Sequence, residues 1–448
     1  MRSDRKFLLQ ITIVFAFLAA YAHEARAYSV LSHEEVVDIC WDHTIQPALL
    51  RRFPQSTPED LKTAHAYAYG GSVIQDIGYY PFGSHEFTNL LHYARTGNFV
   101  DRLVRDSSNI NEYAFALGAL AHYVSDSWGH PAVNESVPIE YPKLRKKHGN
   151  IVTYEDNPEA HLKTEFSFDV VQVAKGRYSG KQYHDFIGFE IAQNLLQRAF
   201  QETYGIALSE FLHNEELSIG TFRFAVSQVI PEMTKVALAS RDHQRLEEKQ
   251  NHAHKEFLFH LSRADYEKQF GSEYQHPGWF AKTLAFFFRL IPKFGPLKAL
   301  QYRDPTPQTE DLYIKSMNNV VRIYVEQAHE IADGTNDLPD RNLDTGDLTK
   351  PGQYKLADDA YSELVLLLAK HNFASVTPGL RENILWYFST SDAHLSLKRG
   401  RWKKTDEALQ MLKATNVPEP SAPKDSLLPR PEEPDRASGG HFVSSEDF

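Results

Sequence analysis

An apolar stretch with helical spacing, residues 111–121, runs directly into a segment that carries two histidines and an aspartate. Residues four and eight positions apart share one face of a helix, so His122, Asp126 and His130 are expected to project side by side from successive turns. A buried helix gains nothing from two imidazoles and a carboxylate unless something pairs with them. The spacing therefore predicts half of a transition-metal site, and zinc is the simplest metal that fits it.

Helical periodicity recurs along the chain, whereas alternating strand-type stretches and hairpin turns are scarce. A strong helix start lies at Thr57, a capping residue followed by a proline and two acids. The sequence predicts an all-α protein, a multi-helix bundle with a site between its helices and a C-terminal helical extension. Helices are expected at about 32–50, 57–76, 86–95, 97–106, 110–130, 157–175 and 184–204.

The first 27 residues are predicted to be a cleaved signal peptide. A basic start precedes an apolar run over residues 7–22 that is short for a membrane span, and residues 25–27 fit a small-residue cleavage site. The mature chain would then begin at Tyr28, and the protein would be secreted or periplasmic.

Cysteine usage restricts the metal chemistry. Cys40 is the only cysteine among 448 residues, so an intramolecular disulfide and a zinc site with two cysteines are both excluded. Any metal must be bound by His, Asp and Glu, which are ligands of catalytic rather than structural zinc sites. The net charge of −11 weighs against a passive nucleic-acid binder, which normally presents a basic face.

Composition divides the chain into four regions. These are the signal peptide (1–27), a helical domain rich in His and Tyr (28–205), a helical extension of unknown role (206–415) and a tail predicted to be disordered (416–448). Within the extension, residues 279–298 interleave aromatic and basic side chains, which suits peripheral membrane contact and equally suits a core helix with lysines at its rim. A loop at 334–353 is rich in Asp, Gly and Asn, but its spacing does not match a calcium-binding EF-hand loop.

Two further pieces extend the His122 motif. His161 and Glu165 are four residues apart and share one helix face, although such a pair alone is more often a surface pair than a ligand pair. His33 lies five residues after Tyr28, whose free α-amino group and carbonyl oxygen could chelate a metal with a nearby histidine.

Together these residues resemble the zinc-dependent phospholipases C of bacteria and, more distantly, the single-strand-specific fungal nucleases that share their fold. That family has an all-helical domain with three zinc ions in a cleft. Its ligands are an N-terminal aromatic residue, a His, an Asp, a His, a His-x-x-x-Asp pair, another His, and a final His-x-x-x-Glu or His-x-x-x-Asp pair. Over about residues 28–205, this sequence supplies in that order Tyr28, His33, Asp76, His92, His122, Asp126, His130, His161 and Glu165.

The resemblance implies three zinc ions and a catalytic role for Asp76, which would position or deprotonate the attacking water. The implied ligands are Tyr28, His33 and Asp126 for one ion; Asp76, His92, His122 and the bridging Asp126 for a second; and His130, His161 and Glu165 for a third.

Two positions depart from the family pattern. The N-terminal aromatic residue is Tyr28 rather than Trp, a change that ligation by backbone atoms tolerates. His130 lies four residues after Asp126 and before Pro131, where the family places its histidine six residues on and after a proline.

One ligand position has two candidates, His85 and His92. The family spacing from Asp76 and an apolar helical setting favour His92, whereas His85 follows Gly83 and Ser84 and is expected in an exposed loop.

The resemblance implies a secreted zinc phosphodiesterase of the phospholipase C type, which cleaves phospholipid head-group esters with zinc-activated water. One alternative keeps the metals and changes the substrate to single-stranded nucleic acid, with Tyr79, Tyr80, Phe82 and Trp128 as stacking platforms. Nucleic acid is the less expected partner. A further alternative is a helical binding protein whose site has lost activity.

Overall fold

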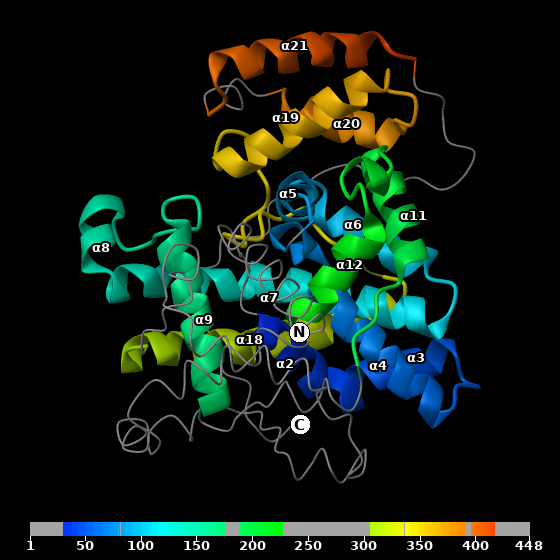
Figure 1. Ribbon diagram of the computed structural model, residues 1–448, viewed down its shortest axis with the longest axis vertical. Coiled ribbons are helices and arrows are strands. Elements are labelled where there is room, and N and C mark those ends of the chain that lie inside the picture. Colours follow the sequence, from blue (N-terminus) through cyan, green and yellow to red (C-terminus); the bar gives the residue numbers. More distant parts are fainter. Residues whose placement is uncertain are drawn as a thin grey trace, which may run out of the picture.

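The computed structural model describes residues 30–80, 82–174, 188–226, 305–335, 337–389 and 396–416. Within these ranges the backbone forms helices and one isolated bridge between Arg341 and Leu348, and it forms no β-strand. The predicted all-α fold is therefore confirmed (Figure 1). None of the described helices is both long and apolar enough to cross a membrane.

The α-helices are α2 (Val30–Cys40), α3 (Gln46–Arg52), α4 (Pro58–Ser72), α5 (His85–Tyr93), α6 (Thr96–Asp106), α7 (Ile110–Glu140), α8 (Pro142–His148), α9 (Pro158–Ala174), α11 (Gln193–Tyr204), α12 (Glu215–Phe224), α18 (Pro307–Ala332), α19 (Lys355–Lys370), α20 (Pro378–Tyr387) and α21 (Arg399–Ala414). Three short segments complete the described elements: the π-helix η1 (Trp41–Ile45) and the 3₁₀ helices η2 (Ile74–Tyr79) and η3 (Leu208–Glu210).

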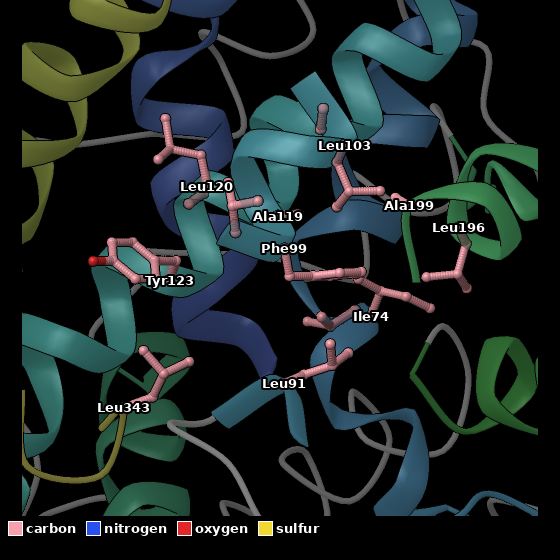
Figure 2. Packing of buried hydrophobic residues seen from close by; sticks show 14 of the residues in the cluster. Ile74, Leu91, Phe99, Leu103, Ala119, Leu120, Tyr123, Leu196, Ala199 and Leu343 are labelled. Atoms are coloured by element: carbon pink, nitrogen blue, oxygen red, sulfur yellow. The ribbon is translucent and has the colours of Figure 1, made fainter. Parts of the chain in front are cut away.

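Helix α7 is the centre of the molecule. Residues 113–127 are all buried, because α4 and α18 pack against this helix and α2, α6 and α9 also contact it. Figure 2 shows part of the surrounding core, in which Ala119 and Leu120 of α7 lie among residues of neighbouring helices. A Cβ atom at Gly118 would lie 2.0 Å from the carbonyl oxygen of Ala68, so glycine is what allows α4 to approach this closely.

Helix α7 is longer than predicted. The expected end at residue 130 is wrong, since the helix continues through Pro131 and Pro138 to Glu140. A proline leaves the carbonyl group four residues earlier without its usual helical donor. At Pro138 that carbonyl belongs to Asn134, and the backbone N–H of Val152 donates to it at 3.0 Å. A hydrogen bond from outside the helix thus replaces the missing one.

Three other helices differ from the prediction. The helix expected over 32–50 is interrupted by η1, where the Trp41 ring stacks on the His65 ring at 3.7 Å. The helix expected to reach residue 76 ends at Ser72, because Val73 leaves the helical conformation. The helix expected over 184–204 begins at Gln193 in the described residues; before it, the backbone N–H of Glu190 donates to a carbonyl of α4.

The last helices lie around this centre. Helix α18 runs beside α7, whereas α19, α20 and α21 gather at one end of the molecule, where α19 contacts α5 (Figure 1). One hydrophobic core includes residues from Val30 to Leu412. The limits 28–205 and 206–415 stay a prediction. The predicted signal peptide, Tyr28, the segment 279–298 and the tail after Asn416 lie outside the described residues.

Candidate metal centre

One face of α7 forms a wall of buried polar side chains. His122, Asp126 and His130 occupy successive turns, and each is at most 2 % exposed. Nε2 of His122 lies 3.1 Å from Oδ2 of Asp126, and Nε2 of His130 lies 3.5 Å from Oδ1 of the same carboxylate. The stripe expected from the sequence is therefore continuous, with the carboxylate between the two imidazoles.

A first group forms where α2 meets this wall. Nε2 of His33 lies 3.4 Å from Oδ1 of Asp126, and the His33 ring stacks on His122 with 4.3 Å between centroids. One ligand atom from each of His33, His122 and Asp126 lies within 4.8 Å of the others. These three side chains could hold a single ion.

A second group combines η2, α5 and α7. The break after α4 turns Asp76 of η2 toward α5, where Nε2 of His92 lies 3.3 Å from Oδ1 of Asp76 and 3.4 Å from Oδ2 of Asp126. Ligand atoms of Asp76, His92 and His122 lie within 4.8 Å of one another. One oxygen of Asp126 therefore lies beside His33 of the first group and the other beside His92 of the second group, which is the arrangement of a bridging carboxylate.

A third group joins α7 to α9. Oε1 of Glu165 lies 2.9 Å from Nε2 of His161 and 3.1 Å from Nε2 of His130. Ligand atoms of these three residues also lie within 4.8 Å of one another. The rings of Tyr154 and His161 lie nearly perpendicular to each other, with 5.7 Å between their centroids.

Backbone carbonyls fix the orientation of three imidazoles. Nδ1–H of His92 donates to Thr88 at 2.9 Å, that of His122 to Ser72 at 3.0 Å, and that of His130 to Leu343 at 2.9 Å. A carbonyl oxygen only accepts, so Nδ1 carries the proton in each ring and Nε2 faces the carboxylates. Metal-binding histidines are held in this way, with the second nitrogen bonded to the protein.

The atoms that face the centre lack hydrogen-bond partners. Both carboxylate oxygens of Asp76 and Asp126, and Nε2 of His92 and His122, are buried and form no hydrogen bond with the part of the chain that the structure describes. Leaving one buried polar group unsatisfied costs about 1–3 kcal/mol, and charged groups cost more. Cations among these atoms would satisfy them, and imidazole nitrogen with carboxylate oxygen is a donor set that zinc favours.

Charge complementarity within the centre is strong. Burial raises the pKa of Asp126, but His122 and His130 outweigh that effect and hold it well below its usual value. Burial lowers the pKa of His92, yet the Asp126 and Asp76 carboxylates raise it to about 10. Burial together with the neighbouring His122 lowers the pKa of His33 well below its usual value. A metal cation would therefore replace the protons that these buried imidazoles and carboxylates otherwise share.

The structure brings together all the predicted ligands that it describes. They are His33, Asp76, His92, His122, Asp126, His130, His161 and Glu165. Tyr28 lies outside the described residues, and metal binding by the whole set stays a prediction.

The expectation of an exposed loop at His85 is wrong. This residue is the first of α5, with Ser84 as the N-cap, and it is half-buried with its ring 5.8 Å from that of Tyr79. Among the described residues, His85 belongs to none of the three groups.

The four aromatic residues considered as stacking platforms for bases differ in their surroundings, and their role stays a prediction. The Arg341 guanidinium lies 4.6 Å from the centroid of the Trp128 ring and covers one of its faces, and Tyr79 is buried with its ring against His92. Tyr80 and Phe82 are half-buried.

Sequence reasoning missed the contribution of Leu343 and Asp344, which lie behind His130. They fall in the Asp-, Gly- and Asn-rich loop, 213 positions after His130 in the case of Leu343, and no local periodicity connects them to the centre.

Comparison with known proteins gives one match. Residues 32–213 match the model of a protein family described as zinc dependent phospholipase C. No curated protein and no solved structure matches the chain. The matched range contains the eight described ligand candidates and ends before the loop that holds Leu343 and Asp344.

Proposed function

We propose that this chain is a zinc phosphodiesterase that hydrolyses phospholipid head-group esters, because residues 32–213 match the model of the zinc dependent phospholipase C family. The observation that carries the proposal is the convergence of three buried ligand groups on one carboxylate, Asp126, from helices that are distant in sequence.

The three groups would hold three ions. His122 belongs to both of the first two groups and is assigned here to the second ion, with Asp76, His92 and Asp126. His33 and Asp126, completed by the amino end at Tyr28, would hold the first ion. The third ion would be held by His130, His161 and Glu165. Bound zinc ions would supply positive charge for the non-bridging phosphate oxygens and lower the pKa of a water molecule toward neutrality.

Asp76 is the candidate catalytic residue. Burial raises the pKa of its carboxyl group, although His122 and His92 oppose that rise. Both of its carboxylate oxygens are buried and form no hydrogen bond with the described residues, so one oxygen could bind an ion while the other positions the attacking water. Water would replace the glycerol oxygen at phosphorus, so the products are a diacylglycerol and a phosphorylated head group.

The position of the amino terminus belongs to the same proposal. A signal peptide that is removed after Ala27 would direct export of the protein and leave a free α-amino group on Tyr28, five residues before His33. The mass of the N-terminal peptide of the secreted protein tests this. A mature chain that begins before Tyr28 would exclude the amino group as a ligand.

Substrate class is tested by direct comparison. Zinc-loaded protein is incubated with phosphatidylcholine vesicles or single-stranded DNA, with Asp126→Asn as the inactive control. We expect phosphocholine release by the wild type and none by the variant. Cleavage of DNA without cleavage of lipid would favour the nuclease alternative. Bound zinc with neither reaction would overturn the proposed substrate class and favour a binding protein.

A further inference from the structure

We propose that the outer-shell segment, residues 337–354, completes the metal centre from outside the family-matched region, and that its Asp344 positions His130 as a ligand of the third group. This inference rests on the proposed function, since it assigns a role toward an ion bound by His130, His161 and Glu165.

The peptide groups of Leu343 connect two helices of the centre. Its backbone N–H donates to the carbonyl oxygen of His92 at 3.0 Å, and its own carbonyl oxygen accepts from Nδ1–H of His130 at 2.9 Å. One residue of the outer-shell segment thus contacts a ligand candidate on α5 and another on α7.

Asp344 is a buried carboxylate held in a fixed orientation. Its Oδ2 accepts from the Tyr93 hydroxyl at 2.8 Å and from the Tyr354 hydroxyl at 2.6 Å. Its backbone oxygen accepts from the side-chain amide of Asn134, one turn after His130 on α7, at 2.8 Å. These three contacts leave Oδ1 directed at the imidazole, 3.8 Å from Nδ1 of His130.

Leu343 and Asp344 lie on the side of the His130 ring that faces away from the third group. Nε2 faces Glu165 at 3.1 Å, whereas Nδ1 faces Leu343 and Asp344. The Leu343 carbonyl fixes the tautomer of the imidazole, because it accepts from Nδ1–H. The Asp344 carboxylate, 3.8 Å from the same nitrogen, acts by its negative charge, which increases the electron density available at Nε2. Asp344 is therefore a positioning residue, which acts on the ion through His130.

Close packing holds the outer-shell segment on α7. Gly346 has φ +73° and lies so close that a Cβ atom there would be 2.0 Å from the carbonyl oxygen of Ser127. Arg341 adds two contacts, since its Nη1 donates to the Gly346 carbonyl at 2.8 Å and its guanidinium lies over Trp128. The segment is thus seated on the turn of α7 between Asp126 and His130.

The test compares two aspartates of the same segment. Asp344→Asn keeps the size and an acceptor for the tyrosine hydroxyls but removes the charge behind His130. Asp347→Asn makes the same chemical change at an exposed position. The dissociation constant of each zinc ion is measured by competition with a chromophoric chelator on the full chain, and ion number is measured by elemental analysis. We expect Asp344→Asn to weaken the third ion about tenfold to hundredfold, and Asp347→Asn to leave it unchanged.

A double-variant cycle separates positioning from general stability. If Asp344 acts through His130, adding Asp344→Asn to His130→Ala should weaken the residual binding by less than about twofold, because the two losses share one interaction. The melting temperature of each metal-free protein reports whether the fold is retained. An equal loss in both backgrounds would overturn the positioning role.

The outcomes separate this inference from the proposed function. Wild-type protein with no ion at the third group would overturn both. Wild-type protein that binds three ions and cleaves phospholipid, with an Asp344→Asn variant of unchanged affinity, would overturn only the outer-shell role.

Discussion

Nε2 of His130 lies 3.5 Å from Oδ1 of Asp126, one turn earlier on α7, even though Pro131 follows directly. This distance explains how His130 stays close to Asp126 although its spacing differs from that of the family the chain resembles. A proline after the histidine does not end the helix, so an offset of four residues keeps the imidazole on the face that carries the carboxylate. The longer offset of the family is not needed for His130 to reach Glu165.

The choice between His85 and His92 can be made by alanine substitution. His92→Ala removes an imidazole that lies 3.3 Å from Asp76, whereas His85→Ala changes a half-buried ring outside the three groups. We expect the first variant to lose at least about a hundredfold in affinity for the second ion, more than the loss typical of a residue behind a ligand. The His85 variant should bind as tightly as the wild type. Titration with a zinc chelator measures both, and a reversed order would assign the ligand to His85.

The contact between α4 and α7 predicts a strong effect at Gly118. A Cβ atom there would lie 2.0 Å from the Ala68 carbonyl oxygen, so Gly118→Ala must separate the helices and should lower the free energy of unfolding by about 1–3 kcal/mol or more. Gly220→Ala is the control, because nothing lies within 4 Å of that helical position. This control should instead stabilise by about 0.5–1 kcal/mol. Urea unfolding measures both, and equal effects would contradict the packing.

Asp101 predicts a pH dependence of stability. Burial raises its pKa to about 7, although the backbone N–H of Leu338 donates to its carboxylate at 3.0 Å and opposes the rise. The folded state therefore holds the proton more tightly than the unfolded state. The contribution of Asp101 to stability should fall as pH rises from about 4, near the unfolded pKa, to about 7, and then level off.

Asp101→Asn isolates the contribution of this carboxyl group to the pH dependence of stability. Relative to the wild type at the same zinc concentration, Asp101→Asn should gain unfolding free energy between pH 4 and pH 8, because it lacks the carboxyl group that must ionise. Denaturant unfolding across this range measures the difference. A constant difference between the two proteins would show that Asp101 keeps an ordinary pKa.

The close packing of the outer-shell segment on α7 predicts that alanine substitutions at two glycines of positive φ affect zinc binding differently. Both substitutions place an alanine at positive φ and strain the backbone. Gly346→Ala also brings its Cβ atom against the Ser127 carbonyl oxygen, whereas nothing lies within 4 Å of the Cβ atom in Gly334→Ala. Both should lose stability, but only the Gly346 variant should weaken the third ion, by about tenfold or more. Chelator competition and thermal unfolding measure the two effects separately. Equal zinc affinity in both variants would show that the seating of the segment does not matter for the third group.

The parts of the centre that could be predicted from the sequence are those within one helix. Helical geometry alone makes His122 and Asp126 neighbours, and it does the same for His161 and Glu165. Local chemistry also predicted the start of α4, where Thr57 and Asp60 form a reciprocal capping box.

The features that were missed depend on distant contacts. Continuation of α7 through Pro138 requires a donor from Val152, which no helix rule anticipates. The place of Leu343 and Asp344 behind His130 depends on tertiary packing of a loop whose composition indicated only a polar connection. Just before α11 begins at Gln193, the backbone of Glu190 likewise contacts α4, which is distant in sequence.

The central claim is that three zinc ions lie on this set of buried side chains. Anomalous diffraction at the zinc absorption edge, from crystals of the mature protein, tests it most directly. We expect three peaks, one each beside His33 and Asp126, beside Asp76 and His92, and beside His161 and Glu165. Crystals grown with zinc that show no peak at any of these groups would contradict the account.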